Sequence, residues 1–155
     1  MYAIDINGDG RKDILTSMGH DYGVCWFEQN ADGSWTQRVI DNTWSQAHAS
    51  VLVDLNGDGQ LDFVTGKRYF AHNGSDPGER EPIGLYWYEY RVTAGARGPS
   101  VMWTRHIIDY GNRMGGGMQI DAKDMDGDGD LDIISGGKAG LFLAENLTKT
   151  PARGR

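Results

Sequence analysis

Carboxylate and amide side chains recur at one fixed spacing in three segments of this chain. The segments read DINGDGRKDIL from Asp5, DLNGDGQLDFV from Asp54 and DMDGDGDLDII from Asp124, each with such a side chain at positions 1, 3, 5 and 9. Alternate oxygen-bearing residues on a tightly curled loop can converge on one point, and the glycine at position 6 permits the positive φ that the curl needs. All-oxygen ligation by several carboxylates favours a hard cation, Ca²⁺.

The predicted calcium ligands are these side chains together with position 7, which offers its backbone carbonyl. An EF-hand loop requires a carboxylate at position 12, where this chain has Thr16, Thr65 and Ser135. The remaining alternative, an Asx-rich turn without metal, is disfavoured by its threefold repetition. We therefore expect about three Ca²⁺ ions per chain, bound by Asp5, Asn7, Asp9, Arg11 and Asp13; by Asp54, Asn56, Asp58, Gln60 and Asp62; and by Asp124, Asp126, Asp128, Asp130 and Asp132.

The motif Asp-x-Asx-x-Asp-Gly-x-x-Asp, followed by an apolar run, resembles the calcium loop of FG-GAP or VCBS repeats. These repeats build β-propellers, including the integrin α-subunit head and many secreted bacterial proteins. More of the unit recurs, since GVCWFEQN at 23–30 aligns with GLYWYEYR at 84–91 and GLFLAENL at 140–147, and SWTQRVID at 34–41 with MWTRHIID at 102–109. Short strands in units of this length are typical of propeller blades.

We therefore expect an all-β fold of about three propeller blades, which is too few for a closed ring. The blades are predicted at about 1–42, 43–109 and 110–147, with a disordered tail at 148–155. Open blades expose strand edges and apolar faces. The expected partners therefore include further blades, from a longer chain or from a self-associated copy.

Composition and charge limit the classes of function that are compatible with this chain. The chain is 39% hydrophobic and 24% charged, as for a packed globular protein, and it has no apolar run long enough to span a membrane. The net charge is −7, and 11 of the 22 acidic residues lie in the three loops, which argues against a nucleic-acid partner. Cys25 is the single cysteine, so an intrachain disulfide is excluded. The resemblance implies an extracellular or periplasmic protein whose leader is not present in this chain.

A second set of polar and aromatic residues is predicted on the opposite face of the blades. The acidic loops join the first and second strands of each blade, so the connection between the second and third strands and the lead-in to the first strand lie at the other end. Aromatic platforms with charged groups and amides suit a sugar or peptide-like ligand. The predicted ligand-binding residues are His20, Asp21, Tyr22, Trp44, His48, Lys67, Arg68, Tyr69 and His72.

Two functions remain open. The first is a calcium-binding recognition module that binds a carbohydrate or a protein on this second face, as the resemblance implies. The alternative is a metal-dependent sugar lyase or isomerase, in which His20, His48 and His72 hold a transition metal. The chain has no His-x-x-x-His pair and no Gly-x-Ser-x-Gly motif, so the sequence favours binding over catalysis.

Overall fold

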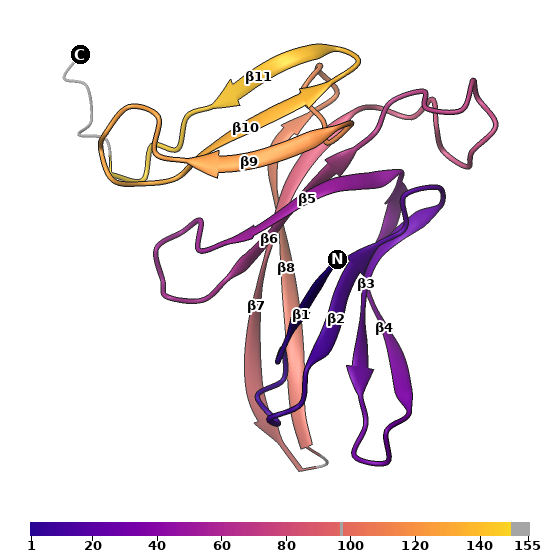
Figure 1. The fold of residues 1–155 in the computed structure, drawn as a ribbon, viewed down its shortest axis with the longest axis vertical. Coiled ribbons are helices and arrows are strands. Elements are labelled where there is room, and N and C mark those ends of the chain that lie inside the picture. Colours follow the sequence, from indigo (N-terminus) through magenta and orange to yellow (C-terminus); the bar gives the residue numbers. More distant parts are fainter. Residues whose placement is uncertain (97, 150–155) are drawn as a thin grey trace.

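The computed structural model describes residues 1–96 and 98–149, and every helix or strand in these residues is a β-strand (Figure 1). The strands form three antiparallel sheets, none of which closes into a barrel. In these described residues there is no helix that could span a membrane. The predicted all-β class is confirmed, and the three sheets are consistent with partial propeller blades.

Each sheet follows the chain in order. The first contains β1 (Tyr2–Ile4), β2 (Asp13–Ser17), β3 (Tyr22–Gln29) and β4 (Trp35–Ser45). The second contains β5 (Ala47–Val53), β6 (Asp62–Lys67), β7 (Gly84–Gly95) and β8 (Gly98–Tyr110). The third contains β9 (Gln119–Lys123), β10 (Asp132–Gly137) and β11 (Gly140–Ala144). The predicted tail falls mostly on 150–155, outside the described residues.

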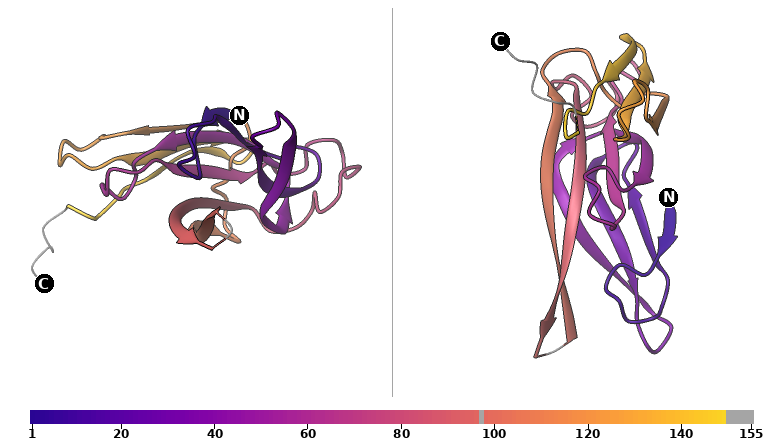
Figure 2. Two further views of the ribbon diagram at one scale, coloured as in Figure 1. Left: turned by 90° about the horizontal axis from the view of Figure 1, so that it is seen from below. Right: turned by 90° about the vertical axis from the view of Figure 1, so that its left-hand side faces the viewer.

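The sheets pack face to face through alternate residues of their second strands. Leu15 of β2 lies in one buried cluster with Phe63 of β6, while Val64, on the other face of β6, lies in a second cluster with Ile133 of β10. Successive side chains of a strand point to opposite faces, so the Phe63–Val64 pair joins the second sheet to both neighbours. The long β7–β8 hairpin runs alongside the first sheet (Figure 2), where Trp103 packs against the first cluster.

The connections fall at two ends of the sheets. The three acidic loops, 5–12, 54–61 and 124–131, lie toward the left and bottom of Figure 1, and the 68–83 connection between β6 and β7 lies at the upper right. The extra length of the second unit is found in this connection and in residues 111–118, which lead into β9. The fold therefore separates the acidic loops from the His-bearing connections.

Candidate functional site

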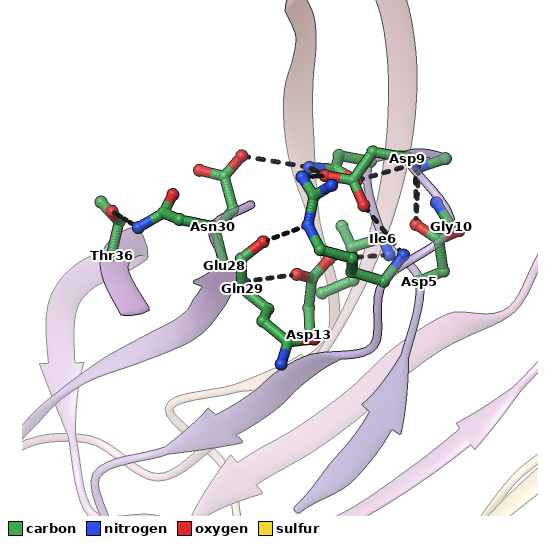
Figure 3. A network of polar contacts seen from close by, with 12 residues as sticks. Asp5, Ile6, Asp9, Gly10, Asp13, Glu28, Gln29, Asn30 and Thr36 are labelled. Carbon is green, nitrogen blue, oxygen red and sulfur yellow. Dashed lines mark hydrogen bonds and ion pairs between the residues drawn. The ribbon is translucent and has the colours of Figure 1, made fainter. Parts of the chain in front are cut away.

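The first acidic loop is built by side chains that accept hydrogen bonds from its own backbone (Figure 3). Asp5 Oδ1 accepts from Gly8 N at 2.8 Å and Asp9 N at 3.1 Å, and Asp5 Oδ2 accepts from Gly10 N at 2.8 Å. Asn7 Oδ1 also accepts from Asp9 N, at 3.1 Å. Gly8 and Gly10 have φ of 75° and 88°, which residues with a Cβ rarely adopt. The oxygen-bearing side chains thus curl around the inside of one tight turn.

The second and third loops repeat this pattern. Asp54 Oδ2 accepts from Gly59 N at 2.9 Å, and Asp124 Oδ2 accepts from Gly129 N at 3.0 Å. At position 3, Asn56 Oδ1 and Asp126 Oδ1 accept from the amide two residues later, at 2.9 and 3.2 Å. In the third loop, carboxylate oxygens of Asp124, Asp126 and Asp128 lie within 4.8 Å of one another. This separation is compatible with shared coordination of one cation.

The aspartate at position 9 does more than line the loop. Asp13 is fully buried, and its two oxygens accept from Ile6 N at 3.0 Å and from Gln29 N at 2.9 Å. Asp132 likewise accepts from Met125 N and Asn146 N, both at 2.8 Å. Position 9 therefore ties the loop to the end of the third strand of its own sheet, and this aspartate would fix the blade with or without a metal.

Side chains at position 7 also connect the loop to the sheet. Arg11 Nε donates to Gln29 O at 2.7 Å, and its guanidinium pairs with Asp9. Gln60 Nε2 donates to the carbonyl of Tyr90. Glu28, on β3, accepts from Asn7 Nδ2 at 3.0 Å, so this strand also contacts the loop (Figure 3).

Burial and repulsion shift the pKa values of these carboxyl groups. Burial raises the pKa of Asp62 to about 6, and the charges of the other two loop aspartates act in the same direction. Burial also raises the pKa of Asp13, with further contributions from Asp9 and Asp5. For Asp9, burial acts upward but is outweighed by the contacts with Arg11 and Asn7, so its pKa is lowered. A cation in the loops would favour the ionised form of every one of these groups.

At the opposite end, the structure brings several of the predicted ligand-binding residues together. The His20 and His72 rings stack with centroids 4.7 Å apart, and Arg68 Nη2 lies 3.2 Å from His20 Nδ1. Both histidines contact the carboxylate of Asp76. His48 lies nearby on β5. Partial desolvation of its ring lowers its pKa, and the positive charges of Arg68, His20 and His72 act in the same direction.

Two predicted ligand-binding residues are buried, which corrects the expectation that they lie open on this face. Trp44 is 5% exposed, and its Nε1 donates to Tyr88 Oη at 2.8 Å, so its ring packs between the first two sheets. Lys67 is 1% exposed, and its Nζ donates to Ser45 Oγ at 2.8 Å. Burial lowers the pKa of Lys67, although the charge of Glu81 opposes the shift. Trp44 and Lys67 therefore both make buried structural contacts.

The other predicted residues of this face make contacts outside the histidine cluster or are exposed. Tyr22 donates to Glu81, and Asp21 accepts from the amide of Tyr22 at 2.7 Å. Tyr69 is exposed in the 68–83 connection.

A groove of about 480 Å³ lies beside Trp44, between the first two sheets. Sequence reasoning missed this groove because residues far apart in the chain line it, and only the packing of β4 against β7 and β8 joins them. Arg105 lines the groove and donates from Nη1 to Asp41 Oδ2 at 2.9 Å, and the exposed Tyr110 also lines it. The lining residues are Thr43, Trp44, Glu81, Pro82, Tyr86, Arg105, Ile107 and Tyr110.

The structure has three antiparallel sheets, and each carries an acidic loop between its first two strands, which is consistent with partial blades of a β-propeller. Residues 5–65 match the model of the FG-GAP-like repeat family. The predicted family resemblance is thus confirmed over the first two acidic loops. The third loop, from Asp124, lies outside the matched residues and has the same backbone contacts. No curated protein and no solved structure matches the chain.

Proposed function

We propose that this protein is a calcium-stabilised recognition module. The observation that carries the proposal is the threefold recurrence of one loop, in which Asp5, Asp54 and Asp124 each accept from the glycine amide five residues later. Oxygen atoms at position 3 also accept from amides of the same short turn, which supports a common orientation of these side chains. Carboxylate-rich turns of this kind suit Ca²⁺, which accepts many oxygen ligands in flexible geometry.

Calcium would act here as a structural ion. Each loop joins the first two strands of a sheet, and position 9 joins the loop to the third strand, as Asp13 does through Gln29 N at 2.9 Å. An ion bound only by the folded loop stabilises the folded chain by mass action. Sites with Kd on the order of 10⁻⁴–10⁻³ M are filled by extracellular calcium, which fits an extracellular or periplasmic location.

We infer that the groove beside Trp44 is the ligand-binding site and that its ligand is an oligosaccharide. Tyr110 is 56% exposed there and offers an apolar ring face, while Arg105, Thr43 and Glu81 offer hydrogen-bonding groups. Such a combination of one open aromatic face with a few polar groups is typical of sugar sites. The groove lies at the end of β4, away from the acidic loops, so calcium would support the ligand site without touching the ligand.

The calcium part of the proposal is tested by native mass spectrometry and calorimetry of the whole chain in calcium buffer. We expect three bound Ca²⁺ ions in the wild type and two in Asp58→Asn, because position 5 of the second loop loses its charge. Asp121→Asn, which alters an exposed aspartate of β9, is the matched control and should keep all three. A wild-type chain that binds no calcium at millimolar concentration would disprove the proposal.

The ligand part is tested by screening the calcium-loaded protein against a panel of neutral and acidic oligosaccharides. Tyr110→Ala should lower the affinity for the oligosaccharide that binds by about tenfold or more, because one aromatic contact is lost. Trp35→Ala removes a similarly exposed ring at the start of β4, near the acidic loops, and should have no effect. Equal effects of the two variants, or no binding anywhere in the panel, would reject the groove as a sugar site.

A further inference from the structure

A cluster of two histidines and one aspartate lies on the face opposite the acidic loops. His20 belongs to the connection between β2 and β3, whereas His72 and Asp76 belong to the connection between β6 and β7. One nitrogen from each ring and one carboxylate oxygen of Asp76 all lie within 4.8 Å of one another. We propose that these three side chains form a binding site for a divalent transition-metal ion of the zinc type.

One of the two distances between ligand atoms matches a metal site, and the other is a hydrogen-bond distance that must lengthen when an ion binds. His72 Nδ1 lies 2.7 Å and His20 Nδ1 lies 3.2 Å from the same Asp76 Oδ2 atom. In a tetrahedral site with bonds of about 2.0–2.1 Å, neighbouring ligand atoms are about 3.3 Å apart. The two rings are nearly parallel, with planes 6° apart, so they must rotate about their side-chain bonds to aim both nitrogens at one ion. Both side chains are partly exposed, at 62% and 46%, which leaves room for this rotation.

The backbone that carries two of the ligands is held by a buried carboxylate. Glu79 is 2% exposed, and its oxygens accept from His72 N at 2.9 Å and from Asp76 N at 3.0 Å. Asn73, between the two ligands, has a φ of 58°, a left-handed conformation that asparagine adopts more readily than most residues and that suits a turn. The spacing of His72 and Asp76 is therefore set before any ion arrives.

The donor set selects a different class of ion from that of the acidic loops. Imidazole suits zinc and related ions, whereas carboxylate and carbonyl oxygens suit calcium. Two imidazoles and one carboxylate leave further coordination positions for water, because the site is open to solvent. A bound ion would link the first sheet to the 68–83 connection of the second, through His20 on one side and His72 on the other.

Arg68 now occupies the position of a cation in this cluster. Its Nη2 lies 3.2 Å from His20 Nδ1 and 3.8 Å from Asp76 Oδ2, and it also donates to Gly19 O at 3.2 Å and Gln46 Oε1 at 3.3 Å. A metal ion must displace this guanidinium from the two ligand atoms, while the contacts with Gly19 and Gln46 can hold it nearby. Arg68 is therefore a competitor whose removal should strengthen metal binding.

The experiment titrates the whole chain with Zn²⁺ by calorimetry and with Co²⁺ by visible absorption, in the presence of excess calcium to occupy the acidic loops. We expect one Zn²⁺ ion per chain and Co²⁺ bands typical of nitrogen–oxygen coordination. His20→Ala, His72→Ala and Asp76→Asn should each weaken Zn²⁺ binding by about tenfold or more, as expected for the loss of one ligand of a metal site. Arg68→Gln should strengthen it, because the competing charge is removed.

His48→Ala and His106→Ala are the controls, since each removes an imidazole that lies outside the cluster, and neither should change Zn²⁺ affinity. Nitrogen-15 shifts of the histidine rings in the folded wild type supply a readout that needs no variant: Zn²⁺ should shift Nδ1 of His20 and His72 only. Absence of stoichiometric Zn²⁺ binding would overturn the proposal. So would binding that all three ligand variants retain, or binding that His48→Ala abolishes.

Discussion

The third acidic loop carries a carboxylate at position 3, where the other two loops carry an amide, and this difference predicts how the loops respond to calcium removal. Asp126 stands where the first two loops have Asn7 and Asn56. Two unit charges 4.8 Å apart repel by about 0.9 kcal/mol in water, and Asp126 lies within that distance of two other carboxylates, Asp124 and Asp128. After screening by salt, we expect Asp126→Asn to stabilise the calcium-free protein by about 1 kcal/mol.

In calcium, we expect the wild type to be more stable than Asp126→Asn, the reverse of their order without calcium. The amide keeps the oxygen that accepts from Asp128 N at 3.2 Å, so the turn is preserved, but the loop loses one negative charge and with it part of its calcium affinity. Urea unfolding in EGTA and in 10 mM calcium measures both effects. Asn56→Asp is the reciprocal variant: it should destabilise the calcium-free chain and increase the stabilisation by calcium. If Asp126→Asn destabilises the chain in EGTA, the charges do not repel as argued.

Three further variants probe contacts that need no ion. Asp132→Asn should destabilise the protein by about 1–3 kcal/mol even in EGTA, because its amide group would face a backbone N–H; unchanged urea midpoints would contradict this. Tyr88→Phe leaves the buried Trp44 Nε1 without its acceptor and should cost about 1–3 kcal/mol, less than additive with Trp44→Phe in a double-mutant cycle. Burial lowers the pKa of Lys67, so between that pKa and the ordinary value the unfolded chain binds more protons than the folded chain. The free energy of unfolding should therefore rise with pH in this range. Lys67→Met should flatten this rise, which urea midpoints measured from pH 7 to 10 would detect.

The strands and the loops could be predicted because both depend on local chemistry. A glycine at position 6 and side-chain acceptors at positions 1, 3 and 5 form a turn within nine residues, so the pattern is complete in the sequence. The glycine at position 4, such as Gly8 with its φ of 75°, is part of the same turn and could have been predicted from its recurrence as Gly57 and Gly127.

Which side chains are buried and which are exposed on the opposite face could not be predicted in the same way. Trp44 and Lys67 follow polar or turn-forming neighbours, and nothing in their local pattern indicates burial. Trp44 lies on β4, whose pairing with β3 shifts register, and Lys67 lies at the end of β6, whose pairing with β5 shifts register beside Ala47. Gln46 joins β4 to β5 with a φ of 63°. A side-chain direction that depends on one irregular residue changes with any shift of that residue. Asp76 lies in the histidine cluster because Glu79, in the same connection, accepts a hydrogen bond from its backbone amide and so fixes the local backbone.

The two ends of the molecule are nevertheless linked by short, buried strands. β6 begins at Asp62, the last predicted ligand position of the second acidic loop, and ends at Lys67, and all six of its residues are buried. The next residue, Arg68, donates its amide to Gln46 O at 2.8 Å and begins the connection that carries His72 and Asp76. A slip of one residue in β6 would turn Phe63 and Val64 to the wrong neighbouring sheets. The hydrogen bond from Leu55 N to Asp62 Oδ2, at 2.9 Å, opposes that slip at the loop end. An ion that rigidifies the second acidic loop would therefore also hold the start of the connection that carries His72 and Asp76, although the acidic loop and the histidine cluster do not touch each other.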